Sequence, residues 1–177
     1  MDKILTTERL LLRKWSNDDM PTLIQMNQDK EVMKYFLNTL NEEESLAFFN
    51  RVQDHFVTNG FGLYVVEDKF TNSFMGYTGF MIANFESSFT PCVEIGWRFK
   101  KEYWGNGYAT EAAKACLNYG FGALNFKSVY SFTSVLNHKS EAVMQRIGME
   151  KIGEFDHPKI KAEHPLCRHV NYLINRP

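Results

Sequence analysis

One segment constrains the fold more than any other, because a strand, a glycine turn and a helix follow one another directly. Apolar and other residues alternate over Cys92–Phe99, which indicates a half-buried strand with Glu94 on the face opposite the apolar one. After the turn at Gly105 and Gly107, apolar positions recur every three to four residues from Tyr108 onward, as in an amphipathic helix. A crossover through this helix into a further strand would be parallel, so the segment predicts an α/β sheet.

Weaker patterns flank this unit on both sides. Asn41 and Glu44 form a capping-box pattern that predicts the start of a helix. The other expected elements are strands over 10–12, 61–67, 74–82, 128–135, about 149–155 and 167–174, and helices over 18–27, 29–33 and from Asn137. The order gives a mixed sheet that is antiparallel early and has one parallel crossover. A length of 177 residues fits a single domain, 1–177, better than two small ones.

Charge and cysteine content narrow the class of protein. The formal net charge is -1, which gives no electrostatic footprint for nucleic acid. Cys92, Cys116 and Cys167 are odd in number, widely spaced and without a CxxC motif, so reduced thiols in a cytoplasmic protein are the simplest interpretation. Residues 1–12 lack the apolar run of a signal peptide, and no stretch is apolar over a bilayer's thickness. We therefore expect no membrane association.

The glycine turn before the long helix is a candidate anion site. The first N–H groups of a helix have no partner within the helix, and its dipole favours negative charge there. Gly105 and Gly107 let the backbone fold closely around a phosphate. A Walker loop would need Gly-Lys-Ser/Thr, and a dinucleotide fingerprint would need glycine where Thr110 stands. Both of those nucleotide sites fit poorly.

Three motifs occur in order along the chain: the opening Thr7-Glu-Arg-Leu-Leu-Leu-Arg13, then Glu94-Ile-Gly-Trp-Arg-Phe with Tyr103-Trp-Gly-Asn-Gly-Tyr-Ala-Thr-Glu-Ala-Ala, and Asn137-x-x-Ser140 followed by Arg146-Ile-Gly-Met149. Together they resemble the GCN5-related N-acetyltransferase (GNAT) superfamily, in particular the branch with the ribosomal-protein N-terminal acetyltransferases (RimJ/RimL-like). The superfamily's pyrophosphate motif is Gln/Arg-x-x-Gly-x-Gly/Ala. Residues 104–109 match it except at Trp104, a residue that this branch commonly has there.

The resemblance implies a GNAT-like fold with a central pair of parallel strands splayed into a V and helices on both faces of the sheet. It implies acetyl-CoA as the co-substrate, with pantetheine in the V and the pyrophosphate on the glycine turn, and no metal. The cofactor-binding residues it implies are Trp97, Arg98, Phe99, Trp104, Gly105, Asn106, Gly107, Tyr108, Ala109, Thr110, Asn137 and Ser140.

Three residues are candidates for proton transfer, since an amine must lose a proton and the leaving thiolate gains from one. Glu94 is the candidate base, although it could be a solvated strand residue. Ser140 resembles the branch's serine that protonates the thiolate, although its role could be limited to hydrogen bonds with backbone groups at the start of the helix. Met144 stands where many members of the superfamily have the tyrosine that acts as general acid. His157 could act as a base, bind substrate or be an ordinary loop histidine. Cys167 with His169 lacks a full metal-ligand set.

The expected activity is acetyl transfer from acetyl-CoA to a primary amine, either a protein N-terminus or a small molecule, by direct attack on the thioester. A CoA-binding regulatory module with little turnover is the main alternative, and a nucleotide-binding protein is a more distant one. Acceptor choice is expected to reside in residues 18–56 and 85–91, which carry no readable code. The chain could act as a monomer or a homodimer.

Overall fold

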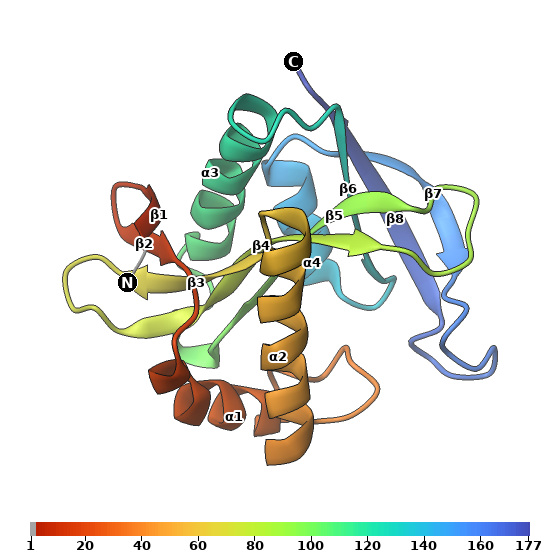
Figure 1. Ribbon diagram of the computed structural model, residues 1–177. Helices are drawn as coiled ribbons and strands as arrows, with labels where there is room; N and C mark the ends of the chain where they lie inside the picture. Colours follow the sequence, from red (N-terminus) through yellow and green to blue (C-terminus); the bar gives the residue numbers. More distant parts are fainter. Residues whose placement is uncertain (1–2) are drawn as a thin grey trace.

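The computed structural model describes residues 3–177, which form one eight-stranded mixed sheet with helices on both faces (Figure 1). The strand order is β1-β2-β3-β4-β5-β6-β8-β7. The strands are β1 (Lys3–Thr6), β2 (Leu10–Arg13), β3 (Leu63–Asp68), β4 (Phe74–Ala83), β5 (Cys92–Phe99), β6 (Ser128–Ser134), β7 (Glu150–Asp156) and β8 (Arg168–Asn175). Only β5 and β6 pair in parallel within this sheet, as the single crossover predicts.

The helices divide between the two faces and seal two cores. They are α1 (Met20–Gln28), α2 (Glu42–Asn59), α3 (Tyr108–Gly122) and α4 (His138–Arg146), with short 3₁₀ turns at Asn17–Asp19 and Lys101–Tyr103. The helices α3 and α4 bury the larger core, which includes Phe80, Ile95 and Cys116. The helices α1 and α2 pack on the opposite face around Trp15 and Tyr77. Figure 1 shows α2 in front of the sheet and α3 behind it.

Local sequence signals account for the best-predicted helix boundaries. The Asn41 side chain accepts from the N–H of Glu44 at 2.8 Å, and the Glu44 carboxylate accepts from the N–H of Asn41 at 2.8 Å, so the predicted capping box is confirmed. At the other end of α2, Gly60 has φ +76°, a conformation that favours glycine.

The prediction of a helix over residues 29–33 was wrong, and β1 was not foreseen. The Asp29 carboxylate accepts from the N–H groups of Glu31 at 2.8 Å and Val32 at 3.3 Å, which fixes a local turn in place of a regular helix. The strand β1 is four residues long and forms a short hairpin with β2 at the sheet edge, and its sequence has no periodic signal of its own.

The parallel pair forms a fork. The strands β5 and β6 share a single register pair, Glu94 with Tyr130, beyond which they diverge. Close to that point the Ser131 hydroxyl donates to the carbonyl of Ile95 at 2.9 Å, which ties the two strands together where the fork begins. The predicted splayed strands are therefore present, and the backbone of the last residues of β5 faces an open gap.

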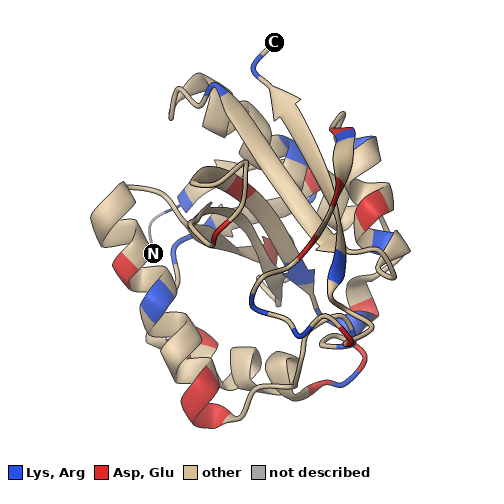
Figure 2. Ribbon diagram, turned by 90° about the vertical axis from the view of Figure 1, so that its right-hand side faces the viewer, with Lys and Arg blue, Asp and Glu red and all other residues tan. Residues whose placement is uncertain are grey.

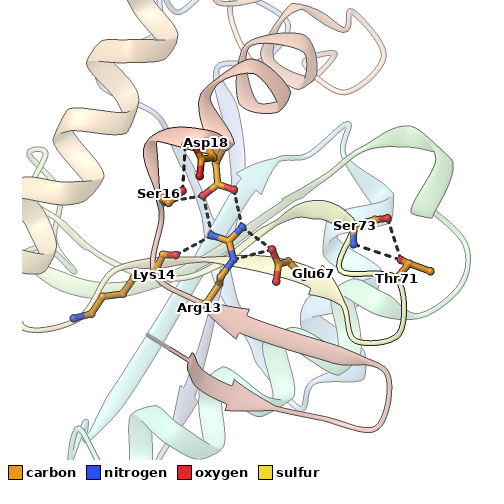
Figure 3. Close-up of polar contacts among 8 residues, drawn as sticks. Arg13, Lys14, Ser16, Asp18, Glu67, Thr71 and Ser73 are labelled. Carbon is orange, nitrogen blue, oxygen red and sulfur yellow. Dashed lines mark hydrogen bonds and ion pairs between the residues drawn. The ribbon is translucent and has the colours of Figure 1, made fainter. Parts of the chain in front are cut away.

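A buried charge network holds α1 to the sheet (Figure 3). Arg13 of β2 is 3% exposed and contacts Asp19 at 2.7 Å and Glu67 of β3 at 2.6 Å. The Arg13 guanidinium also donates to the carbonyl of Lys14 at 2.9 Å, and the Asp19 carboxylate accepts from the N–H of Ser16 at 2.8 Å. Hydrogen bonds from Arg13 to the two acids outweigh its burial and raise its pKa. This network positions the helical layer that faces Glu94.

Met1 and Asp2, the first residues of the segment expected not to be a signal peptide, lie outside the described residues. The three cysteines are unpaired and buried. No helix in the described part of the chain is long and apolar enough to cross a membrane. Figure 2 shows basic and acidic residues interspersed over helices and loops.

Candidate active site

The glycine turn forms an open cradle at the N-terminus of α3. Gly105 and Gly107 both have φ +79°, which glycine adopts without strain, and Gly107 is the N-cap of the helix. A Cβ atom on Gly105 would meet nothing within 4 Å, and one on Gly107 would meet only the Arg9 side chain at 3.7 Å. The N-cap has no side chain to satisfy the N–H groups of Tyr108, Ala109 and Thr110, so this helix end can receive an anion.

Two residues far apart in the sequence brace this cradle. The Arg9 guanidinium donates to the carbonyl of Asn106 at 3.0 Å, contacts Glu111 at 2.7 Å and lies 4.3 Å from the centre of the Tyr108 ring. The Glu111 carboxylate also accepts from the Thr7 hydroxyl at 2.6 Å. Partial burial tends to raise the pKa of Glu111, but the hydrogen bonds from Thr7 and Arg9 outweigh it and lower that pKa. The sequence motif around Thr7 and Arg9 predicted a strand start but not this contact with the cradle.

Trp104 and Lys139 connect the cradle to β5 and α4. The Trp104 indole donates to the carbonyl of Phe99 at 2.9 Å, so the aromatic residue at this motif position fixes the turn to the end of β5. The Lys139 ammonium lies 4.6 Å from the centre of the Trp104 ring. Lys139 is a second cation close to the cradle, alongside Arg9. It was not predicted from the sequence, because no motif includes the position before Ser140.

On the other arm of the fork, Asn137 and Ser140 form a small polar network. The Asn137 amide donates to the Thr133 hydroxyl and to the Ser140 hydroxyl oxygen, both at 3.0 Å, and its carbonyl accepts from the N–H of Ser140 at 3.3 Å. Asn137 is therefore the N-cap of α4, and the Ser140 hydroxyl keeps its own proton to donate. Met144, at the position of the family's tyrosine, is 1% exposed in the core.

Glu94 lies on the face of β5 that points to α1 and α2. Its carboxyl group is half-buried, and this burial raises its pKa to about 8. Burial and the Glu94 charge also raise the pKa of Cys92 to about 11. On the same face, a Cβ on Gly96 would meet nothing within 4 Å, although the φ of Gly96 does not require glycine. The missing side chain leaves free space beside Glu94.

The Arg98 side chain occupies the C-terminal end of this face, on the side of α1 and α2. Its guanidinium donates to the Asn27 amide oxygen at 2.6 Å and lies 4.1 Å from the centre of the Phe36 ring and 5.3 Å from that of Tyr77. The Arg98 side chain is 8% exposed and points into the layer of α1 and α2. The Arg98 carbonyl lies against Gly76 of β4, so of the three β5 residues expected to contact the cofactor only Trp97 and Phe99 turn their backbone groups toward the fork.

His157 follows β7 and lies among aromatic rings. Its ring centre is 4.7 Å from that of Phe85 and 5.1 Å from that of His169. Its Nδ1 accepts from the N–H of Lys159 at 3.3 Å. Burial first, and then the charges of His169 and Lys159, lower its pKa, so the ring is neutral at pH 7. No group of three or more potential metal ligands occurs within residues 3–177.

The comparisons with known proteins agree with this geometry. The family model described as an acetyltransferase (GNAT) domain matches residues 9–150. The chain is 34% identical to the uncharacterized protein YkkB of Bacillus subtilis (strain 168), over 82% of this chain and 84% of that protein. It is 32% identical to the uncharacterized N-acetyltransferase YnaD of the same strain, over 85% of each chain.

Solved structures show the same fold. The crystal structure of a GNAT-family acetyltransferase from Bacillus anthracis matches with a TM-score of 0.81 and 28% identity, covering 97% of this chain and 98% of that one. A spermidine N-acetyltransferase from Vibrio cholerae, solved in complex with CoA and spermine, matches with a TM-score of 0.76. It is 20% identical and covers 96% of this chain and 97% of that chain, a likeness that shows the fold alone.

Proposed function

Because the chain belongs to the acetyltransferase (GNAT) family, we propose that it transfers an acetyl group from acetyl-CoA to a primary amine by direct attack on the thioester. It is an enzyme of the acyltransferase class, and its family uses acetyl-CoA. The observation that carries the proposal is the combination of the β5–β6 fork with an uncapped, glycine-lined helix N-terminus at its open end.

The residues present fit the cofactor. The cradle at Gly105–Thr110 has helix N-terminal N–H groups that no side chain caps, and Gly105 and Gly107 place no Cβ in the way of a pyrophosphate. Arg9 and Lys139 add positive charge beside it. The backbone of Trp97 and Phe99, at the open part of the fork, would pair with pantetheine as an added strand would.

Glu94 and Ser140 would carry the proton transfers. Glu94 would accept a proton from the attacking amine as the new N–C bond forms. Ser140 would donate its hydroxyl proton to the sulfur as the C–S bond breaks, and its hydrogen bond from the Asn137 amide holds its oxygen in place. His157 is less suited to the role of base, because Lys159 occupies its Nδ1. We therefore assign His157 to the acceptor side.

The proposed branch of the family and the proposed acceptor rest on sequence motifs. Thr7–Arg13 and Asn137-x-x-Ser140 support the RimJ/RimL-like branch, in which the acceptor is a protein N-terminus, while the 32% identical YnaD is named only as an N-acetyltransferase. We keep both a protein N-terminus and a small-molecule amine within the proposal. We also propose that residues 1–177 form a single cytoplasmic N-acetyltransferase domain, working without a metal as a monomer or homodimer.

The site of CoA binding can be tested with a pair of glycine variants. Gly107→Val should weaken CoA binding by at least tenfold in calorimetry, because a β-branched side chain strains φ +79° and blocks backbone approach. Gly60→Val is the matched control, since Gly60 has φ +76° and equally open surroundings but ends α2. Equal CoA affinity in both variants would place the site elsewhere.

Turnover distinguishes the enzyme from the alternative of a regulatory CoA-binding module. The wild-type chain should release thiol from acetyl-CoA in the presence of amines, and Glu94→Gln should suppress that release without weakening CoA binding. Tight CoA binding with no thiol release across amines, polyamines, aminoglycosides and N-terminal peptides would favour the module.

A further inference from the structure

Seven rings gather on the Glu94 face of the sheet, outside the cofactor fork, and we call them the aromatic basin. They come from the β4–β5 loop, β6, β7 with the loop after it, and β8, which lie together at the right of Figure 1. The basin consists of Phe85, Phe89, Tyr130, Phe132, Phe155, His157 and His169. Every one of these residues is half-buried. The rings therefore form a surface that is partly open to solvent.

Ring–ring contacts fix the shape of the basin. Phe89 stacks on Tyr130 at 5.7 Å between centroids, and Phe85 stacks on Phe155 at 5.9 Å. Edge contacts of 5.3 Å and 5.8 Å join Phe132 to Phe85 and Phe155. The Thr90 hydroxyl donates to the carbonyl of Phe85, which holds the β4–β5 loop over the sheet. A set of rings ordered in this way loses little entropy when it binds a ligand.

A hollow of about 370 Å³ adjoins the basin at the start of β5 and β6. Phe89 and Tyr130 line both the basin and the hollow. The remaining walls are mostly apolar: Ile82, Pro91, Cys92, Val93, Phe126, Lys127 and Ser128. The volume is within the range of small-molecule sites, so the surface has room for an apolar group of modest size.

The basin begins beside the candidate base. Tyr130 is the register partner of Glu94, and paired residues of neighbouring strands point to the same face. The space left by Gly96 lies on that face as well. An amine near Glu94 would therefore have the Phe89–Tyr130 end of the basin next to it, within reach of its substituent.

The basin itself offers no negative charge to a polycation. A ligand with several ammonium groups needs several carboxylates, and none of the seven residues of the basin carries one. The pKa values of His157 and His169 are lowered, in both cases chiefly by burial, so both rings are neutral at pH 7. Neutral rings favour an apolar partner.

From these observations, and resting on the acetyltransferase function proposed above, we propose that the acceptor is a primary amine that carries an apolar, aromatic substituent, and that the aromatic basin binds this substituent. The basin is thus the specificity element of the site, and the ring of the acceptor would extend the stack formed by Phe89 and Tyr130.

The test compares acceptors that share an ethylamine unit and differ in the group attached to its second carbon. We expect kcat/KM for 2-phenylethylamine to exceed that for ethanolamine by about a hundredfold, since burying one phenyl ring is worth about that ratio. Spermidine should be no better than ethanolamine. Phe89→Ala should reduce the preference for 2-phenylethylamine about tenfold and leave the KM for acetyl-CoA unchanged. Phe70→Ala, a control 76% exposed between β3 and β4, should leave the preference intact.

The proposal is overturned if ethanolamine or spermidine is the better acceptor, or if Phe89→Ala leaves the preference unchanged. Calorimetric titration of 2-phenylethylamine separates this failure from failure of the acetyltransferase function. Binding that Phe89→Ala abolishes, without acetyl transfer to any amine, would support the basin and refute the function. Acetyl transfer without aromatic preference would refute the basin alone.

Discussion

Replacing Glu94 by glutamine should stabilise the folded protein at alkaline pH while it lowers turnover. The substitution keeps the shape of a half-buried side chain and removes a carboxyl group whose pKa burial raises from 4.5 to about 8. Between these two pH values the unfolded chain has lost the Glu94 proton and the folded chain retains it. Glu94 therefore contributes full stability below pH 4.5, and that contribution is lost as the pH rises through about 8.

The size of the effect follows from the pKa change. A change from 4.5 to about 8 corresponds to at most about 5 kcal/mol between the two ends of the range. Glu94 is partly exposed, so water screens the charge and we expect about 2 kcal/mol. For a chain of this size that is a difference in Tm of about 4–8 °C.

The assay is a thermal melt of wild type and Glu94→Gln at intervals from pH 5 to pH 9. The Tm advantage of the variant should grow with pH and level off above about pH 8. Glu154→Gln is the control, because contacts with Lys151 and Arg168 lower the pKa of this exposed carboxylate. Glu154→Gln should therefore show no Tm advantage over wild type that grows between pH 5 and pH 9.

Kinetics test the role of the same carboxyl group as a base. Wild-type kcat/KM should rise with pH and level off near pH 8, at the same pH for two acceptors whose amine pKa values differ. Glu94→Gln should remove this ionisation and lower turnover by about a hundredfold or more, with acetyl-CoA affinity unchanged. A Tm difference between wild type and Glu94→Gln that stays constant from pH 5 to pH 9 would refute the raised pKa of Glu94. Unchanged turnover in Glu94→Gln would refute its role as the general base.

Two further substitutions test other parts of the structure. Arg13→Met should lower the free energy of unfolding in urea by about 3–5 kcal/mol, because it leaves the buried carboxylates of Asp19 and Glu67 without a counter-ion. Arg168→Met is the control, since the exposed Arg168 also contacts two carboxylates. Similar losses of stability in both variants would contradict the argument. Ser140→Ala should slow the single-turnover rate, with a smaller deficit for an acyl donor whose thiol is more acidic; Thr133→Val, which removes the other hydroxyl that Asn137 contacts, should show no such donor dependence. A Ser140→Ala deficit equal for both donors would take Ser140 out of proton transfer.

Features that depend on neighbouring residues could be predicted from the sequence. The period of two over Cys92–Phe99 and the helical period after Gly107 are local, so β5, the glycine turn and α3 could be predicted directly. The capping box at Asn41 was predictable for the same reason. The helix predicted over 29–33 was wrong because the Asp29 carboxylate accepts from the N–H of Glu31 and stabilises a turn instead. The pattern of apolar residues does not reveal such a hydrogen bond.

Contacts between residues far apart in the sequence follow from the three-dimensional packing. Periodicity shows that a strand has a buried face but not which strand lies beside it, so the insertion of β8 between β6 and β7 was not predictable. Arg9 and Glu111 brace the cradle across 102 positions of sequence, and the aromatic basin draws on four separate segments. The raised pKa of Glu94 has the same origin, because it depends on how much water the surrounding layers exclude from the carboxyl group.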